Sequence, residues 1–160
     1  MTDELDRIER KITIEAPAAR VWELIAEPGW YINDHAITEH RLERDGDLTV
    51  VHDPVHGAFA FRTETLEEPH YAAFRWLSDA SNPDSPSTLV EFRLDAVSES
   101  STVLQVTETG FESLPGDSAE HRARYEGNAE GWTVELNLAR QHLEAGKPVA
   151  TQSIGTVRRA

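Results

Sequence analysis

The longest regular pattern of apolar positions covers residues 117–145, where apolar side chains recur every three or four residues. This is the spacing of one face of an α-helix. Asp117 or Ser118 can cap the first turn, because a side-chain oxygen there accepts from backbone N–H groups that lack a partner within the helix. Gly146 and Pro148 favour the end of the helix soon afterwards. The apolar stripe is Tyr125, Ala129, Trp132, Leu136, Ala139 and Leu143, and the face predicted to meet water is Arg124, Glu126, Glu130, Glu135 and Gln141.

Apolar and polar residues alternate with a period of two in several segments before this helix, which predicts β-strands with one buried face. Ile8, Ile12 and Ile14 indicate the first strand, and residues 36–44 fit either a loop or a strand. Short turns between the segments favour antiparallel pairing. The remaining predicted strands are residues 48–52, 58–67, 71–77, 88–96 and 101–109.

Between the first strand and the rest, Pro17 favours the start of a short helix to about Ala26, because proline suits the first helical position. Residues 30–32 fit a further aromatic half-turn. Helices kept apart from a run of antiparallel strands indicate the class α+β. We therefore expect a curved antiparallel sheet of about six strands around the long C-terminal helix, as one domain over residues 1–148. Residues 149–160 are polar and unpatterned, so we expect a flexible tail.

The charge and composition exclude several classes of partner. The 160 residues carry a formal net charge of -14, which would repel phosphate groups, so we expect neither a nucleic acid nor a membrane as partner. There are no cysteines, which excludes disulfides and thiol catalysis. The charged start does not resemble a signal peptide, and no apolar run approaches the roughly 18 residues of a membrane span. The expectation is a soluble cytoplasmic protein.

Several short motifs resemble, in their order and spacing, the START-like, helix-grip proteins of the SRPBCC superfamily. Within it they are similar to the family of the C-terminal domain of the activator of the ninety-kilodalton heat-shock-protein ATPase. The resemblance covers residues 8–146 and implies a sheet that grips the long helix. The superfamily includes lipid carriers, hormone receptors and aromatase/cyclases, so the resemblance specifies the fold more than the activity. The motifs are Ile12-Thr13-Ile14-Glu15-Ala16-Pro17, Val21-Trp22, Phe74-Arg75-Trp76, Thr88-Leu89-Val90-Glu91-Phe92, Thr107-Glu108-Thr109-Gly110-Phe111 and Gly131-Trp132 with Leu136.

The chain departs from that family pattern in two respects. One turn after Leu136, where a second leucine is usual, it has Ala139 with Leu138 beside it. The eukaryotic activator also has a separate N-terminal domain with much of the chaperone contact, and the 160 residues show no counterpart. We therefore expect a stand-alone domain of the bacterial type. A module that modulates a chaperone ATPase is an alternative based on the resemblance alone.

A sheet that grips a helix tends to leave a cavity between them, where a ligand can bind. Glu108 has the strand parity of Leu104 and Val106 and should face that cavity if they do. A buried carboxylate has a raised pKa, and it can act as a general base or bind an amine or hydroxyl. The alternative is a structural partner for an arginine or a helix N-terminus. The predicted cavity lining is Trp30, Trp76, Phe92, Glu108, Phe111, Tyr125, Trp132 and Leu136, although aromatic residues at this spacing also fit a plain core.

The leading hypothesis is that a small apolar or aromatic molecule binds in this cavity. An enzyme of the cyclase or hydrolase kind is the alternative, with Glu108 as acid or base and Tyr125 as hydrogen-bond donor in the same cavity. Gly127 and Gly131 each cost the helix roughly 1 kcal/mol relative to alanine. They therefore indicate either close packing on the sheet or room for a ligand.

The seven histidines do not form a recognisable metal motif. His52 and His56 flank a proline-bearing turn, where a spacing of four does not bring two imidazoles to one face. His35 and His40 are also expected in loops. We predict no metal and no cofactor, and no serine or glycine motif for covalent catalysis or phosphate binding is present. Exposed edge strands would allow a homodimer.

Overall fold

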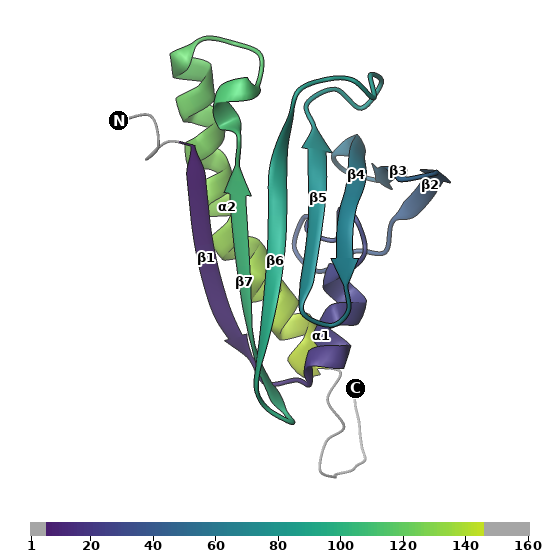
Figure 1. The fold of residues 1–160 in the computed structure, drawn as a ribbon, viewed down its shortest axis with the longest axis vertical. Coiled ribbons are helices and arrows are strands. Elements are labelled where there is room, and N and C mark those ends of the chain that lie inside the picture. The colour runs from purple at the N-terminus through teal and green to yellow at the C-terminus, as the bar shows by residue number, and fades with distance from the viewer. Residues whose placement is uncertain (1–5, 146–160) are drawn as a thin grey trace.

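The computed structural model describes residues 6–145, which form seven β-strands, two α-helices and a short 3-10 helix (Figure 1). The sequence predicted about six strands, and the additional strand is β2, in the segment that fitted either a loop or a strand. The predicted tail and the cap at Gly146 lie outside the described residues. The elements are β1 (Arg7–Ile14), α1 (Ala18–Ile25), β2 (Arg41–Asp45), β3 (Leu48–Asp53), β4 (Gly57–Glu67), β5 (Tyr71–Leu77), β6 (Ser87–Ser98), β7 (Ser101–Thr109), η2 (Phe111–Ser113) and α2 (Ser118–Ala145).

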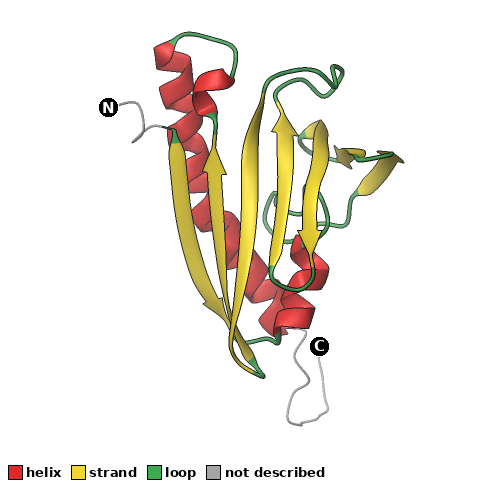
Figure 2. Cartoon of the chain, viewed as in Figure 1, coloured by secondary structure: helices red, strands yellow, loops and turns green. Residues whose placement is uncertain are grey.

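All seven described strands belong to one antiparallel sheet in the order β1-β7-β6-β5-β4-β3-β2. The chain proceeds by hairpins from β2 to β7, and β1 then pairs with β7 at the edge of the sheet. The helix α2 runs obliquely along one face, and α1 covers the end of the same face (Figure 2). This arrangement confirms the predicted class, a curved antiparallel sheet that grips a long C-terminal helix.

Strand parity decides which side chains meet α2. In β7, Leu104, Val106 and Glu108 are fully buried, and in β6 Val90 and Phe92 are fully buried. Val90 pairs with Glu108 and Phe92 with Val106 across the two strands. The alternation read from the sequence therefore places Glu108 on the inner face among apolar neighbours.

The core contains a cluster of aromatic rings between α2 and the sheet. Trp30 and Tyr31, in the turn after α1, pack against Phe92 of β6 and Trp132 of α2. The ring centroids are 5.6 Å apart for Trp30 and Phe92, and 4.6 Å apart for Tyr31 and Trp132. These distances and tilted orientations are those of favourable aromatic contacts. The predicted half-turn thus places two buried rings within the core.

Gly29 makes this turn possible. Its φ is 75°, in the left-handed region, and an added Cβ would lie 2.8 Å from Val51 Cγ2 and 2.9 Å from Phe61 Cε2. Only glycine combines this backbone conformation with such a close approach. The Pro28-Gly29 pair that ends the first helix in the sequence therefore also sets how closely the aromatic turn approaches the sheet.

The first turn of α2 is closed by a reciprocal pair of hydrogen bonds. Asp117 Oδ1 accepts from the Glu120 N–H at 2.9 Å, and Glu120 Oε1 accepts from the Asp117 N–H at 2.8 Å. We expect Asp117→Ala to lower the free energy of unfolding by about 1 kcal/mol, because the cap is lost. Urea denaturation measures this change. Glu99→Ala, in an exposed turn, is the control, and an equal loss there would show that the cap contributes nothing specific.

Candidate functional site

A pocket opens between the N-terminal half of α2 and the neighbouring ends of β5, β6 and β7. Its cavity volume of about 370 Å³ lies within the range of small-molecule sites. We call it the α2 pocket. Its walls combine apolar side chains from the sheet with polar groups from β6, β7 and α2. The lining residues are Phe59, Trp76, Leu77, Ser78, Thr88, Glu108, Leu114, Arg124, Gly127 and Asn128.

A smaller hollow of about 120 Å³ adjoins the α2 pocket further along the helix. The two share Trp76, Gly127 and Asn128 as lining residues. We call this second space the side hollow. A ligand that enters one therefore meets the wall of the other. The side hollow is completed by Tyr31, Gly131, Trp132 and Glu135.

Glu108 is the buried polar centre of the α2 pocket. Its side chain accepts from Thr88 Oγ1 at 2.6 Å and from Trp132 Nε1 at 2.7 Å. Asn128 Nδ2 lies 3.1 and 3.2 Å from its two oxygens. Burial raises the pKa of Glu108, whereas these three donors and the charge of Arg124 oppose the rise. These four contacts use the roughly four acceptor positions of the carboxylate, two on each oxygen, so a further donor would have to replace one of the two longer Asn128 contacts.

Of the two structural partners that the sequence leaves open for Glu108, an arginine and a helix N-terminus, no arginine among the described residues forms a hydrogen bond or ion pair with it. Its hydrogen bonds within the described residues come from neutral donors, and Arg124 acts on it through charge alone. Arg75 pairs with Glu64, and Arg62 with Asp47. The carboxylate is therefore held in the wall of a pocket without a direct ion pair.

Two glycines keep α2 open towards both spaces. A Cβ added to Gly127 or to Gly131 would meet no atom within 4 Å. Close packing of the helix on the sheet is therefore not the reason for these residues. Of the two explanations offered by the sequence, the structure favours free space beside the helix.

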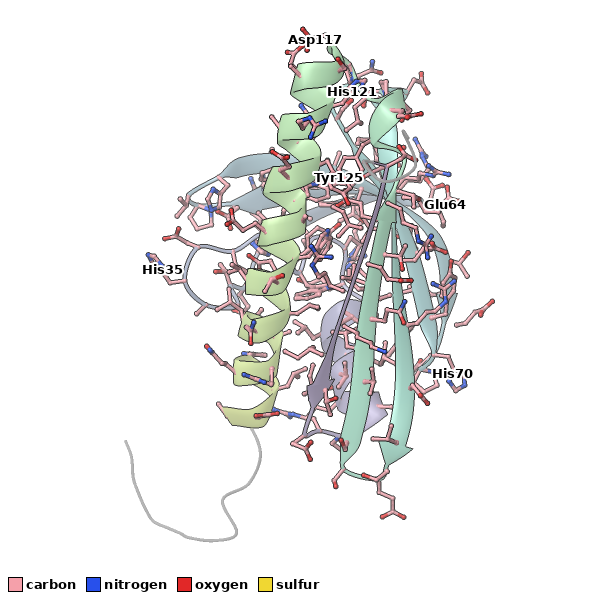
Figure 3. The ribbon with its side chains drawn as sticks, turned by 90° about the vertical axis from the view of Figure 1, so that its left-hand side faces the viewer. His35, Glu64, His70, Asp117, His121 and Tyr125 are labelled. Atoms are coloured by element: carbon pink, nitrogen blue, oxygen red, sulfur yellow. The ribbon has the colours of Figure 1, made fainter. Side chains whose placement is uncertain are left out.

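The structure distributes the eight predicted lining residues over four places. Trp76 and Glu108 line the α2 pocket, and Trp76 and Trp132 line the side hollow. Tyr125 points from α2 towards the sheet (Figure 3), where its hydroxyl donates to the Arg7 carbonyl at 3.0 Å. It lines neither space. The others lie in the core, each at most 2% exposed and outside both linings: Trp30, Phe92, Phe111 and Leu136.

The enzyme hypothesis required the polar ends of Glu108 and Tyr125 in one cavity, and the structure does not bring them together. The tyrosine near Glu108 is Tyr31, whose buried hydroxyl has no hydrogen-bond partner among the described residues. Burial, and then the charge of Glu108, raise the pKa of Tyr31 well above its ordinary value. The phenol beside the carboxylate is thus neutral and remains able to donate.

Several pocket residues were not predicted from the sequence. Arg124 and Glu135 were assigned to the water-facing side of the helix, but each lines one of the two spaces. Asn128 and Thr88 were not singled out. One signal was present, because Arg124, Gly127, Asn128, Gly131 and Glu135 recur every three or four residues and form a second stripe along the helix.

Three histidines outside the lining of this pocket each pair with a single group. His40 Nε2 lies 2.8 Å from the buried Asp53, and His52 Nε2 lies 2.9 Å from Glu43. His56 contacts the Asn33 carbonyl at 3.2 Å. Among residues 6–145 no three histidine or acidic side chains converge as metal ligands would.

A larger hollow of about 670 Å³ lies on the opposite face of the sheet, beside Lys11, His70 and Arg93. His70 marks that face, away from α2, in Figure 3. Tyr71 there donates to Glu91, and the Arg93 guanidinium stacks over the Tyr71 ring at 4.9 Å. Because these polar groups already satisfy one another, the α2 pocket is the better candidate site.

A curved antiparallel sheet that grips a long C-terminal helix beside a pocket defines a helix-grip domain. Residues 15–144 match the model of the family described as Activator of Hsp90 ATPase homolog 1-like protein. The chain belongs to this family, which confirms the resemblance read from the motifs. None of the curated proteins compared with the chain matches it.

Solved structures agree with this fold. Protein MLL2253 from Mesorhizobium loti is 15% identical, with a TM-score of 0.66 over 88% of this chain and 98% of that one. The Zhui aromatase/cyclase from Streptomyces sp. R1128 is 23% identical, with a TM-score of 0.65 over 92% and 98%. The Aha1 dimer from Colwellia psychrerythraea is 17% identical, with a TM-score of 0.61 over 88% and 98%. Likeness at these identities shows the fold alone.

Neither α1 nor α2 has the length and apolar character needed to cross a bilayer.

Proposed function

We propose that this domain binds a small molecule with an apolar or aromatic body in the α2 pocket. The body would lie against Phe59, Trp76 and Leu77, and a hydroxyl or amine would donate to Glu108. The observation that carries the proposal is a fully buried carboxylate in the wall of a pocket that stays open beside the helix glycine Gly127. A purely structural carboxylate would not require that open space.

The affinity of such a complex would depend on the residues that line the α2 pocket. Each square ångström of apolar surface removed from water contributes about 25 cal/mol, so the ring of Trp76 and its neighbours would supply most of the affinity. A ligand donor at Glu108 would add specificity, because a buried acceptor discriminates against molecules that lack the donor. The similarity to an aromatase/cyclase supports a ligand with rings.

The experiment that tests binding is a titration with fatty acids, flavonoids and polyketides, followed by tryptophan fluorescence. Trp76 and Trp132 line the two spaces, so a bound molecule should change their emission. No response to any class would remove the proposal.

Two substitutions at Gly127 then locate the site. Gly127→Leu places a branched side chain at the wall shared by both spaces, and we expect it to weaken binding about tenfold by filling volume. Gly127→Ala is the matched control, because its Cβ meets no atom within 4 Å. The alanine should leave binding unchanged and raise the free energy of unfolding by up to about 1 kcal/mol. Equal affinity for both variants would place the ligand elsewhere.

A further inference from the structure

The side hollow combines aromatic rings with an acidic group. Tyr31, Trp76 and Trp132 form its walls, and Glu135 closes one side. Glu135 Oε1 accepts from Asn33 Nδ2 at 2.7 Å. Within the part of the chain that the structure describes, this is its one side-chain hydrogen bond, and it forms no ion pair. Three aromatic side chains thus line the same hollow as a carboxylate that forms no ion pair within the described residues.

This arrangement is costly for the protein alone. Burial raises the pKa of Glu135, and the Asn33 hydrogen bond and the charge of His56 offset this only in part. A cation in the hollow would stabilise the ionised carboxylate directly. It would also lie over aromatic faces, which attract ammonium groups and favour quaternary ones.

We infer that the side hollow is a subsite for an organic cation, a protonated amine or quaternary ammonium group carried by the ligand of the α2 pocket. The inference rests on the proposed function and adds the chemical class of the ligand. The hollow of about 120 Å³ suits a compact head group such as trimethylammonium. The apolar body would continue past Gly127 into the α2 pocket, since the two spaces share that wall.

The charges elsewhere in the site fix the direction of the ligand. Arg124 lines the α2 pocket and not the side hollow, so it repels a cation from the far end. Glu108 already accepts four hydrogen bonds from three neutral donors, so a ligand hydroxyl there would replace one of the two Asn128 contacts. The net charge of -14 adds a general attraction for cations. The ammonium group therefore belongs at Glu135.

The test compares two probes of the same shape: 4-hydroxybenzyltrimethylammonium and its neutral carbon isostere, 4-neopentylphenol. Each is titrated into the protein at fixed ionic strength, and the indole N–H signals of Trp76 and Trp132 are followed by NMR. We expect the ammonium probe to bind about fivefold more tightly than the isostere. Glu135→Gln should reduce this preference, because the carboxylate charge is lost while the aromatic faces remain, and its amide oxygen can still accept from Asn33.

Glu130→Gln is the matched control, because it removes the same charge from an exposed position of the same helix. It should leave the preference intact. If the neutral probe binds as tightly as the ammonium probe, or if both variants reduce the preference equally, the cation subsite is overturned and the proposed function stands. If neither probe binds, the cation subsite falls. If the fatty acids, flavonoids and polyketides also fail to change the tryptophan fluorescence, the proposed function is removed as well.

Discussion

Replacing Phe92 with alanine is expected to lower the free energy of unfolding by about 3–5 kcal/mol. The ring is fully buried in the centre of β6, and it packs against rings from three other elements or turns. Its centroid lies 5.6 Å from that of Trp30, 5.8 Å from Trp132, 5.9 Å from Tyr31 and 6.3 Å from Phe74. Truncation would leave a cavity that four large rings cannot readily fill. Urea denaturation of both proteins measures the loss.

The size of this loss also shows whether Phe92 belongs to the closed core or lines a pocket. Phe92 was predicted to line a cavity, and a ring that borders open space would lose fewer contacts on truncation. Val134→Ala is the control, because Val134 is 50% exposed on α2 and should change the free energy of unfolding by less than about 0.5 kcal/mol. A loss below about 1.5 kcal/mol for Phe92→Ala would contradict the closed packing of the aromatic cluster.

The fold was predictable because every second residue is apolar in a strand with one buried face. This alternation shows which side of the strand faces the core. Leu104 and Val106 set the parity of β7, and that parity alone predicts that Glu108 lies on the inner face with them. The long helix followed from its apolar stripe, and its bounds followed from the capping residues at either end. The sequence does not decide between a loop and a strand at β2, because its residues are almost all exposed and no burial pattern marks it.

The pocket was predicted less well, because side-chain character does not separate a pocket wall from water. Arg124 and Glu135 were placed on the outer face for their charge, yet the glycines between them leave that stripe beside an empty space. Tyr31 was missed for another reason. It lies in an irregular turn whose path depends on the positive φ of Gly29, and periodicity carries no information about such a turn.

Periodicity also could not divide the aromatic residues between core and pocket. Trp132 and Leu136 lie one turn apart on the same apolar stripe, but only Trp132 borders the side hollow. The difference comes from Gly131, which removes a side chain beside the indole. The distinction thus depends on the side chain that Gly131 lacks. A glycine adds neither an apolar nor a polar side chain to the sequence pattern, so the pattern does not mark the space beside it.

Glu108→Gln is expected to become more stable relative to the wild-type protein as the pH rises. Burial raises the pKa of Glu108 in the folded protein above its ordinary value of 4.5, so the folded state binds more protons than the unfolded chain between these two values. The free energy of unfolding of the wild-type protein therefore falls as the pH rises through this window. Glutamine does not titrate, so the free energy of unfolding of the Glu108→Gln variant does not fall for this reason. Urea denaturation of both proteins from about pH 4.5 to about pH 8 measures the difference.

Glu108→Leu separates the charge from the hydrogen bonds. Glutamine still offers an oxygen to Trp132 Nε1, whereas leucine leaves that buried N–H without an acceptor. The free energy of unfolding of the leucine variant should therefore be about 1–3 kcal/mol lower than that of the glutamine variant. Residue 108 should add no pH dependence to this difference, because neither leucine nor glutamine titrates. A glutamine advantage that shrinks as the pH rises would mean that the folded pKa lies below the ordinary value of 4.5. The folded protein would then stabilise Glu108 in its charged form. Burial of this carboxylate beside the pocket would cost no free energy that a bound ligand could restore.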